Sequence, residues 1–151
     1  GLIYHYYASK EELLSCIITK IMENRDKELE PLQTAKLSAE SKIKMLTNTM
    51  RELIMESDRL AATFTLMENM NLISEDRKIF NQWSEPSIAI LSKIIQQGQQ
   101  EKSCYLGNSI EMSVSYWGLI SAICRDKLCL GKNIQYSFEA LNRMLLKGEK
   151  E

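Results

Sequence analysis

The sequence has few residues that interrupt helices, with only two prolines and six glycines among its 151 residues. It also lacks any run of β-branched residues with strict alternation of apolar and polar positions, which a half-buried strand would show. Apolar residues instead recur every three or four positions, which is the spacing of one helix face. We therefore expect an all-α fold with long helices.

Histidine occurs once, as His5, and this scarcity excludes several kinds of active site. A ferritin-like di-iron centre requires two Glu-x-x-His pairs, and a catalytic cysteine needs a partner histidine. The sequence also has no glycine-rich phosphate loop, no Gly-x-Ser-x-Gly turn and no zinc-ligand spacing. We therefore expect no enzyme activity, no catalytic residue, no metal and no cofactor.

Long apolar runs and an excess of one charge are missing as well. No stretch approaches the roughly 18 apolar residues that span a bilayer. The longest candidate, 116–124, is broken by Gly118 and Ser121, so we expect no membrane partner. The formal net charge of −1 gives no electrostatic signature of nucleic-acid binding.

The four cysteines form no Cys-x-x-Cys pair, and with a single histidine they lack the usual partners of a zinc site. We interpret them as reduced, mostly packed thiols of a cytoplasmic protein, with a redox sensor as the alternative. They are Cys16, Cys104, Cys124 and Cys129.

The most informative segment is 1–14, which reads Gly-Leu-Ile-Tyr-His-Tyr-Tyr-Ala-Ser-Lys-Glu-Glu-Leu-Leu. Taken as a helix, it presents a ring nitrogen, a phenol and a hydroxyl on one side. Its other side is suited to packing. The outward side carries Leu2, His5, Tyr6 and Ser9, and the packing side carries Ile3, Tyr4 and Tyr7.

A new helix is expected to begin directly after this tract. Ser9 stands three residues before Glu12, which is the capping-box spacing. Lys10 then lies at the amino end of the new helix, where free backbone N–H groups and the helix dipole already favour an anion.

These residues resemble the end of the helix-turn-helix in TetR/AcrR-family bacterial regulators, where the pattern is roughly Gly-x-Leu-Tyr-x-His/Tyr-Phe-x-Ser/Asn-Lys-x-x-Leu. The resemblance implies that the recognition helix enters the major groove, with Tyr4, His5 and Tyr6 as DNA contacts and Lys10 as a phosphate contact. Aromatic packing without DNA binding is the alternative. Eight fixed positions match, with Ile for Leu and Tyr for Phe: Gly1, Ile3, Tyr4, Tyr6, Tyr7, Ser9, Lys10 and Leu13.

The resemblance also implies a division of the chain. Residues 1–9 would be the remnant of a helix-turn-helix DNA-binding domain, and residues 10–151 a TetR-like ligand-binding and dimerisation domain of about six helices. Two further helices would precede Gly1 in a family member, so only the intact protein is expected to bind operator DNA.

Caps, breaks and apolar spacing predict the helices individually. Ser38 is the candidate N-cap of one long helix, and Asn108 or Ser109 begins another. We expect Pro31 to stop the first helix, and Pro86 to occupy the first turn of another after a short segment over 74–83. The predicted ranges are 10–29, 39–56, 59–73, 86–98, 109–130 and 134–147.

The predicted helix 109–130 is apolar on more than one side, so a second surface must cover part of it. Gly118 and Ala122 have the small-x-x-x-small spacing that lets two helix backbones come close. In the family, the last two helices pair with those of a second copy as a four-helix bundle, and the resemblance therefore implies a homodimer. The dimerisation candidates are Gly118, Ala122, Leu141 and Leu145. Room for a neighbour within the chain is the alternative role of Gly118.

The middle helices carry many methionine and aromatic side chains, which suit an adaptable pocket for a small hydrophobic effector. The alternative is that these side chains form only the core. Glu68 and Glu111 could face a cationic ligand, but we interpret them as solvated carboxylates. The ligand-binding candidates are Met50, Phe64, Met67, Met70, Trp83, Tyr116 and Trp117.

The sequence thus predicts a DNA-binding transcriptional regulator whose operator binding is controlled by a small hydrophobic ligand. Of the two kinds of regulator, we expect a repressor. The competing hypothesis is a helical protein-interaction adaptor, in which exposed methionines and tryptophans bind a partner helix.

Overall fold

The computed structural model describes residues 5–73, 77–130 and 137–148, without the side chains of 70–73 and 77–80. This part of the chain is folded into six α-helices, and its only β-type pairing is a single bridge between Cys104 and Leu146. The helices are α1 (Lys10–Thr34), α2 (Ala39–Glu56), α3 (Asp58–Ile73), α4 (Arg77–Gln100), α5 (Ser109–Leu130) and α6 (Glu139–Leu145).

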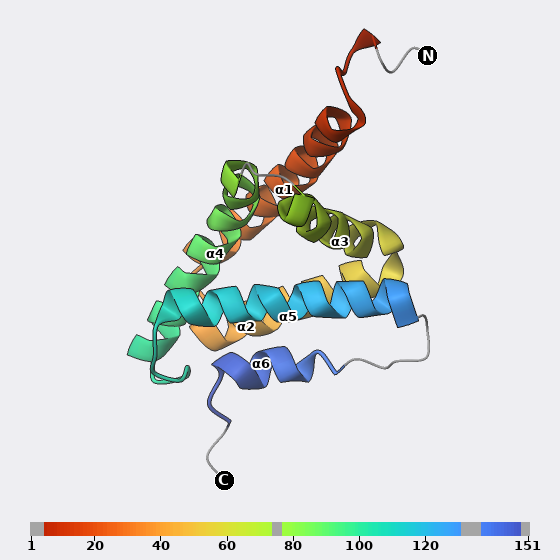
Figure 1. Ribbon diagram of the computed structural model, residues 1–151. Coiled ribbons are helices and arrows are strands. Elements are labelled where there is room, and N and C mark those ends of the chain that lie inside the picture. Colours follow the sequence, from red (N-terminus) through yellow and green to blue (C-terminus); the bar gives the residue numbers. More distant parts are fainter. Residues whose placement is uncertain (1–4, 74–76, 131–136, 149–151) are drawn as a thin grey trace.

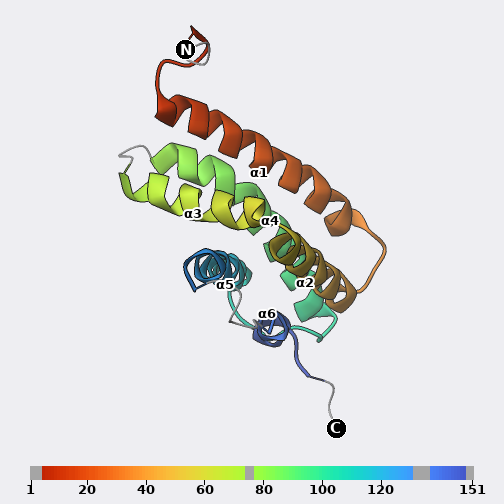
Figure 2. The ribbon, with the colours of Figure 1, turned by 90° about the vertical axis from the view of Figure 1, so that its right-hand side faces the viewer.

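The helix α4 contacts four others, α1, α2, α3 and α5. In one view α3, α4 and α5 form the sides of a triangle (Figure 1). The perpendicular view shows α1 on one side of α3 and α4, with α5 on their other side and α6 beyond it near α2 (Figure 2). This order lets α5 contact α3, α4 and α6.

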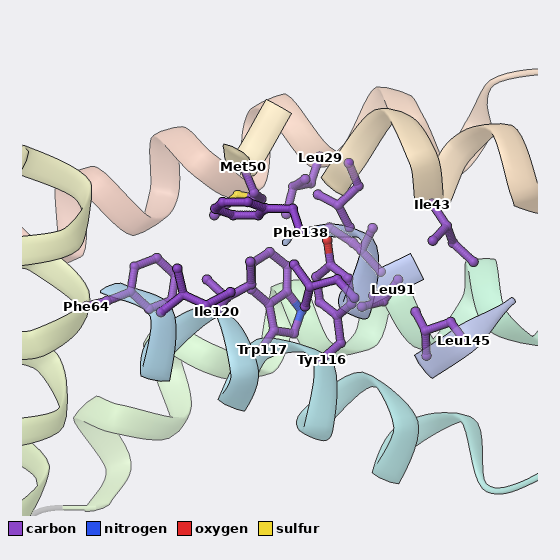
Figure 3. Close-up of a cluster of buried hydrophobic side chains, with 14 of the residues drawn as sticks. Leu29, Ile43, Met50, Phe64, Leu91, Tyr116, Trp117, Ile120, Phe138 and Leu145 are labelled. Carbon is purple, nitrogen blue, oxygen red and sulfur yellow. The ribbon is translucent and has the colours of Figure 1, made fainter. Parts of the chain in front are cut away.

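One continuous core fills the space between these helices. Figure 3 shows side chains from α1 to α6 gathered around Tyr116 and Trp117 of α5. The Tyr116 hydroxyl shares a 3.0 Å hydrogen bond with Thr47 Oγ1 of α2, which satisfies both buried polar groups. Burial raises the pKa of the Tyr116 phenol, so this side chain stays neutral at physiological pH.

The predicted caps of three helices are confirmed. Ser9 Oγ accepts the Glu12 N–H at 3.1 Å, and Ser38 Oγ accepts the Ser41 N–H at 3.2 Å. Asn108 Oδ1 accepts the N–H groups of the second and third residues after it, at 3.0 and 3.3 Å. These bonds satisfy amide groups that have no partner inside the helix.

Both predictions about proline were wrong. Pro31 lies inside α1, which continues to Thr34, and Pro86 lies inside α4, which is one helix and not two. A proline in a helix removes one backbone hydrogen bond, but buried side chains on both sides can hold the helix together. Leu29 and Leu32 pack on the core around Pro31, and Trp83 and Ile90 do so around Pro86.

The last helix is shorter than predicted, since α6 covers only Glu139–Leu145. Residues 131–136, which include the predicted start, lie outside the described residues. The C-terminal end has a clear cause, because the backbone after α6 pairs with the α4–α5 loop. Tyr105 N–H donates to Leu145 O at 3.0 Å, and Lys147 N–H donates to Ser103 O at 2.8 Å.

Of the recognition helix expected over 1–9, the structure describes residues 5–9, which form a 3₁₀ turn at His5 and bends, with extended backbone at Ser9 before α1. This segment lies at the far end of α1, away from the bundle (Figure 1). Tyr6 is 77% exposed.

Candidate ligand site

A cavity of about 190 Å³ lies between α1, α3, α4 and α5, and we call it the α3–α5 cavity. Its apolar wall includes Phe64 and Trp117, whose rings are stacked with centroids 6.5 Å apart and planes at 14°. Met67 and Ile88 add flexible and branched aliphatic surface. An apolar wall with a few polar groups is typical of a small-molecule site.

The lining also includes the polar residues Glu68, Ser84, Ser87, Ser121 and, from α1, Arg25. Its Nε and Nη2 atoms donate to Asp26 Oδ1 at 2.9 and 2.7 Å, and Nη2 also donates to the carbonyl oxygen of Trp83 at 2.7 Å. The guanidinium carbon lies 5.5 Å from the centroid of the Trp117 ring. Burial lowers the pKa of the Arg25 guanidinium, and the Asp26 carboxylate opposes that shift.

The backbone of α4 is tied to α5 beside the cavity. Trp117 Nε1 donates to Ser87 O at 3.2 Å, and Ser113 Oγ donates to Ile88 O at 2.9 Å. These two bonds fix the Trp117 ring relative to the segment of α4 that follows Pro86. The aromatic wall is therefore held in place before any ligand binds.

A second hollow, of about 310 Å³, lies between the end of α1 and α2, and we call it the α1–α2 groove. Arg25 contributes to its wall as well, so this one side chain stands between the two hollows. Its rim includes side chains that are substantially exposed, among them Leu37 at 42%, Met45 at 49% and Leu53 at 41%.

The structure places the seven predicted ligand residues in different surroundings. Phe64, Met67 and Trp117 line the α3–α5 cavity, and Met50 lines the α1–α2 groove. Trp83 and Tyr116 line neither hollow and belong to the core, where Trp83 Nε1 donates to Thr19 Oγ1 at 2.8 Å. The Met70 side chain lies outside the described residues.

Sequence reasoning missed Arg25, although a signal was present. Residues 18, 22, 25 and 29 are spaced as one helix stripe, and three of them are buried apolar side chains: Ile18, Met22 and Leu29. A charged residue within such a stripe must face the interior and find partners there. Glu68 was interpreted as a solvated carboxylate, but it lines the α3–α5 cavity and is half-buried.

The predicted DNA contacts are only partly described. Tyr4 lies outside the described residues, whereas His5, Tyr6 and Lys10 are exposed at the amino end of α1. Nothing in this structure tests their role, which stays a prediction.

The four dimerisation candidates separate into two groups. Gly118 is exposed, with no atom within 4 Å of the place where a Cβ atom would lie, and Ala122 is half-buried. Leu141 and Leu145 of α6 are 0% exposed and pack in the core of their own chain. Neither leucine therefore offers side-chain surface to a second copy, because both pack inside the chain against its other helices.

The cysteines are all free thiols, of which Cys16 and Cys129 are exposed. Burial, with a smaller contribution from Glu68, raises the pKa of Cys124 to about 12, and burial likewise raises that of Cys104. In the described part of the chain, no three His, Cys, Asp or Glu side chains gather as a metal site would require. No described helix is both long and apolar enough to cross a bilayer.

Comparison with known proteins gives a structural answer. No family sequence profile matches the chain, and no curated protein sequence matches it. The structure is similar to the reduced form of NemR from E. coli, with a TM-score of 0.61 and 18% identity over 95% of this chain and 74% of that one. It is also similar to a Mesorhizobium loti protein assigned to the TetR family of transcriptional regulators, with a TM-score of 0.60 and 16% identity over 95% and 73%. The chain therefore has the all-α fold of TetR-type regulator structures along nearly its whole length.

Proposed function

We propose that this chain is the regulatory part of a DNA-binding transcriptional regulator, a repressor whose operator binding is controlled by a small, mostly hydrophobic ligand in the α3–α5 cavity. The observation that carries the proposal is that α1 forms part of the wall of this cavity. That helix begins directly after the helix-turn-helix-like tract and supplies Arg25 to the cavity wall.

The link between cavity and DNA would be mechanical. Arg25 lies 15 residues after Lys10 on one continuous helix, a distance of about 22 Å at the usual rise per residue. A ligand that binds one orientation of α1 more tightly shifts the population toward that orientation, and equal affinity for both would shift nothing. A change at Arg25 would thus move the exposed residues at the amino end of α1.

The adaptor hypothesis has less support. It requires tryptophans on the surface, but Trp83 is 2% and Trp117 is 7% exposed. Exposed methionines remain on α2, at Met45 and Met55, and single exposed apolar side chains are common on soluble proteins.

The proposed regulator would act as a homodimer, in which α5 contributes the contact surface. Ile110 and Val114 are 57% and 49% exposed, and Gly118 follows four residues later on the same side of the helix. A twofold dimer matches the symmetry of palindromic operators, whose half-sites lie about one helical turn apart.

The test of DNA binding uses the natural protein in its full length. Genomic fragments from beside its own gene are the DNA probes in a gel-shift titration. The double variant His5→Ala, Tyr6→Ala is expected to lose roughly tenfold or more in affinity, because base contacts are worth about 1–3 kcal/mol each. Tyr105→Ala is the matched control, since Tyr105 is an exposed tyrosine in the α4–α5 loop. Binding that both variants leave unchanged would remove residues 5 and 6 from the DNA interface.

A further inference from the structure

Arg25 has hydrogen-bonding capacity that the folded chain does not use. A guanidinium carries five N–H donors. Asp26 and the Trp83 carbonyl oxygen account for the donors of Nε and Nη2. Among the described residues, none accepts a hydrogen bond from the two N–H groups of Nη1. The Arg25 side chain is 9% exposed, and Nη1 is not among the buried polar atoms that lack a partner, so its N–H groups contact water that an acceptor on a ligand would replace.

The guanidinium end of Arg25 lies at the α3–α5 cavity, because it is stacked over Trp117, which forms the cavity wall. The hydroxyl of Ser87 on the same wall already donates to Ser84 O at 3.1 Å. The cavity therefore presents N–H donors beside an aromatic surface. A ligand that satisfies them must carry an acceptor atom.

The charges around the cavity oppose an ionic ligand. The Arg25 charge is already balanced by Asp26, 2.7 Å away, and Glu68 adds a carboxylate to the wall. An anion would meet Glu68 without an unpaired cation to offset the repulsion. A cation would be attracted by Glu68 but could not take the usual place over the Trp117 ring, because the guanidinium already occupies it. A neutral ligand avoids both costs.

The cavity is partly open to solvent, and its volume accommodates a small molecule. An apolar protein cavity of about 150 Å³ holds benzene, and the α3–α5 cavity measures about 190 Å³. One aromatic ring with a short substituent fits this volume. The flat, stacked surfaces of Phe64 and Trp117 suit such a ring.

We propose that the α3–α5 cavity takes a neutral, single-ring aromatic compound whose carbonyl oxygen accepts hydrogen bonds from Arg25 Nη1. This assignment rests on the proposed function, which makes the cavity the effector site. It gives Arg25 two roles, since the residue that recognises the ligand oxygen also ties α1 to α4 through Trp83 O.

Four probes of nearly equal size test the assignment by calorimetric titration of the 151-residue chain. Acetophenone carries the neutral acceptor, ethylbenzene lacks it, benzoate is anionic and benzylammonium is cationic. We expect acetophenone to bind roughly tenfold more tightly than each of the others, the gain that one hydrogen bond to a charged donor gives. Equal affinity for acetophenone and ethylbenzene would overturn the role of Arg25 while leaving the cavity as a ligand site.

Variants of Arg25 test whether this residue causes the preference for acetophenone over ethylbenzene. In Arg25→Met, acetophenone should bind as weakly as ethylbenzene, whose own affinity should stay within twofold. Arg51→Met, which changes an exposed arginine of α2, should retain the full preference. If Arg25→Met loses ethylbenzene binding as well, its cavity has collapsed, and Arg25→Lys then decides: a retained fold with a reduced acetophenone preference supports the proposal, and an unchanged preference overturns it.

Two further outcomes separate this proposal from the function on which it rests. Preferential binding of benzoate or benzylammonium would overturn the neutral ligand class but leave a regulator with a ligand cavity. Binding of no probe at millimolar concentration would overturn both the ligand class and the cavity as effector site. The gel-shift result with the full-length protein reports on DNA binding independently of either outcome.

Discussion

At the scale of single residues, Gly98 allows three segments of the chain to pack closely because it has no side chain. A Cβ atom at this position would lie 2.2 Å from Cys104 Sγ and 3.1 Å from the Ala39 side chain. The Gly98 carbonyl oxygen also accepts the N–H groups of Ser103 and Cys104, at 2.9 and 3.0 Å. The end of α4, the loop after it and the start of α2 therefore depend on the absence of a side chain here.

Gly98→Ala is expected to destabilise the chain by about 2 kcal/mol, because the new methyl group must displace a buried sulfur atom or the α2 backbone. Gly148→Ala is the control, since nothing lies within 4 Å of its Cβ position after α6. That change should alter the stability by less than about 0.5 kcal/mol, as surface substitutions usually do. Urea unfolding followed by circular dichroism measures both values, and equal effects of the two variants would contradict this account.

At the scale of elements, the sequence predicted the helices where local chemistry sets the boundary. The bounds of α2 and α5 agree with those predicted from Ser38 and Asn108, because each cap bonds N–H groups in the first turn. Local rules failed at Pro31 and Pro86, where packing on both sides outweighs one lost hydrogen bond. The end of α6 was unpredictable for a similar reason, since it depends on pairing with a loop some forty residues earlier in the chain.

The candidate site was predictable in its apolar part only. Helical spacing identified Phe64, Met67 and Trp117, which share the α3–α5 cavity. The same spacing could not separate them from Tyr116, which also has apolar neighbours in the sequence but whose hydroxyl bonds to Thr47 of α2. Arg25 was missed because its partners, Asp26 and the Trp83 carbonyl oxygen, are brought together only by the packing of α1 on α4.

The Asn108 cap allows a prediction at the same scale. Asn108→Ala should cost about 1 kcal/mol of stability, because the first N–H groups of α5 lose their acceptor. Asn108→Asp keeps the acceptor oxygen and adds a favourable charge at the helix amino end, so its stability should equal or exceed that of the parent chain. Thermal unfolding at neutral pH compares the three proteins. A loss in the aspartate variant as large as that in the alanine variant would rule out capping as the cause.

At the scale of the whole molecule, several of the described apolar side chains are exposed, and on α5 three of them share one side of the helix. Ile110, Val114 and Leu128 are exposed at intervals that place them on a common side, at 57%, 49% and 39%. Gly118, between them, leaves the backbone open to close approach. Because α6 packs its leucines inward, the proposed dimer must use this side of α5 and not the buried residues of α6.

Ile110→Glu tests that surface in the 151-residue chain. A carboxylate on each copy near a twofold axis would be desolvated and repel its equivalent, at a cost of about 3 kcal/mol or more, which corresponds to over a hundredfold weaker association. Light scattering at micromolar concentration should therefore report twice the monomer mass for the parent chain and the monomer mass for Ile110→Glu. Met55→Glu is the control, since Met55 is also 57% exposed but lies on α2. A dimer lost equally in both variants, or absent from the parent chain, would refute α5 as the interface.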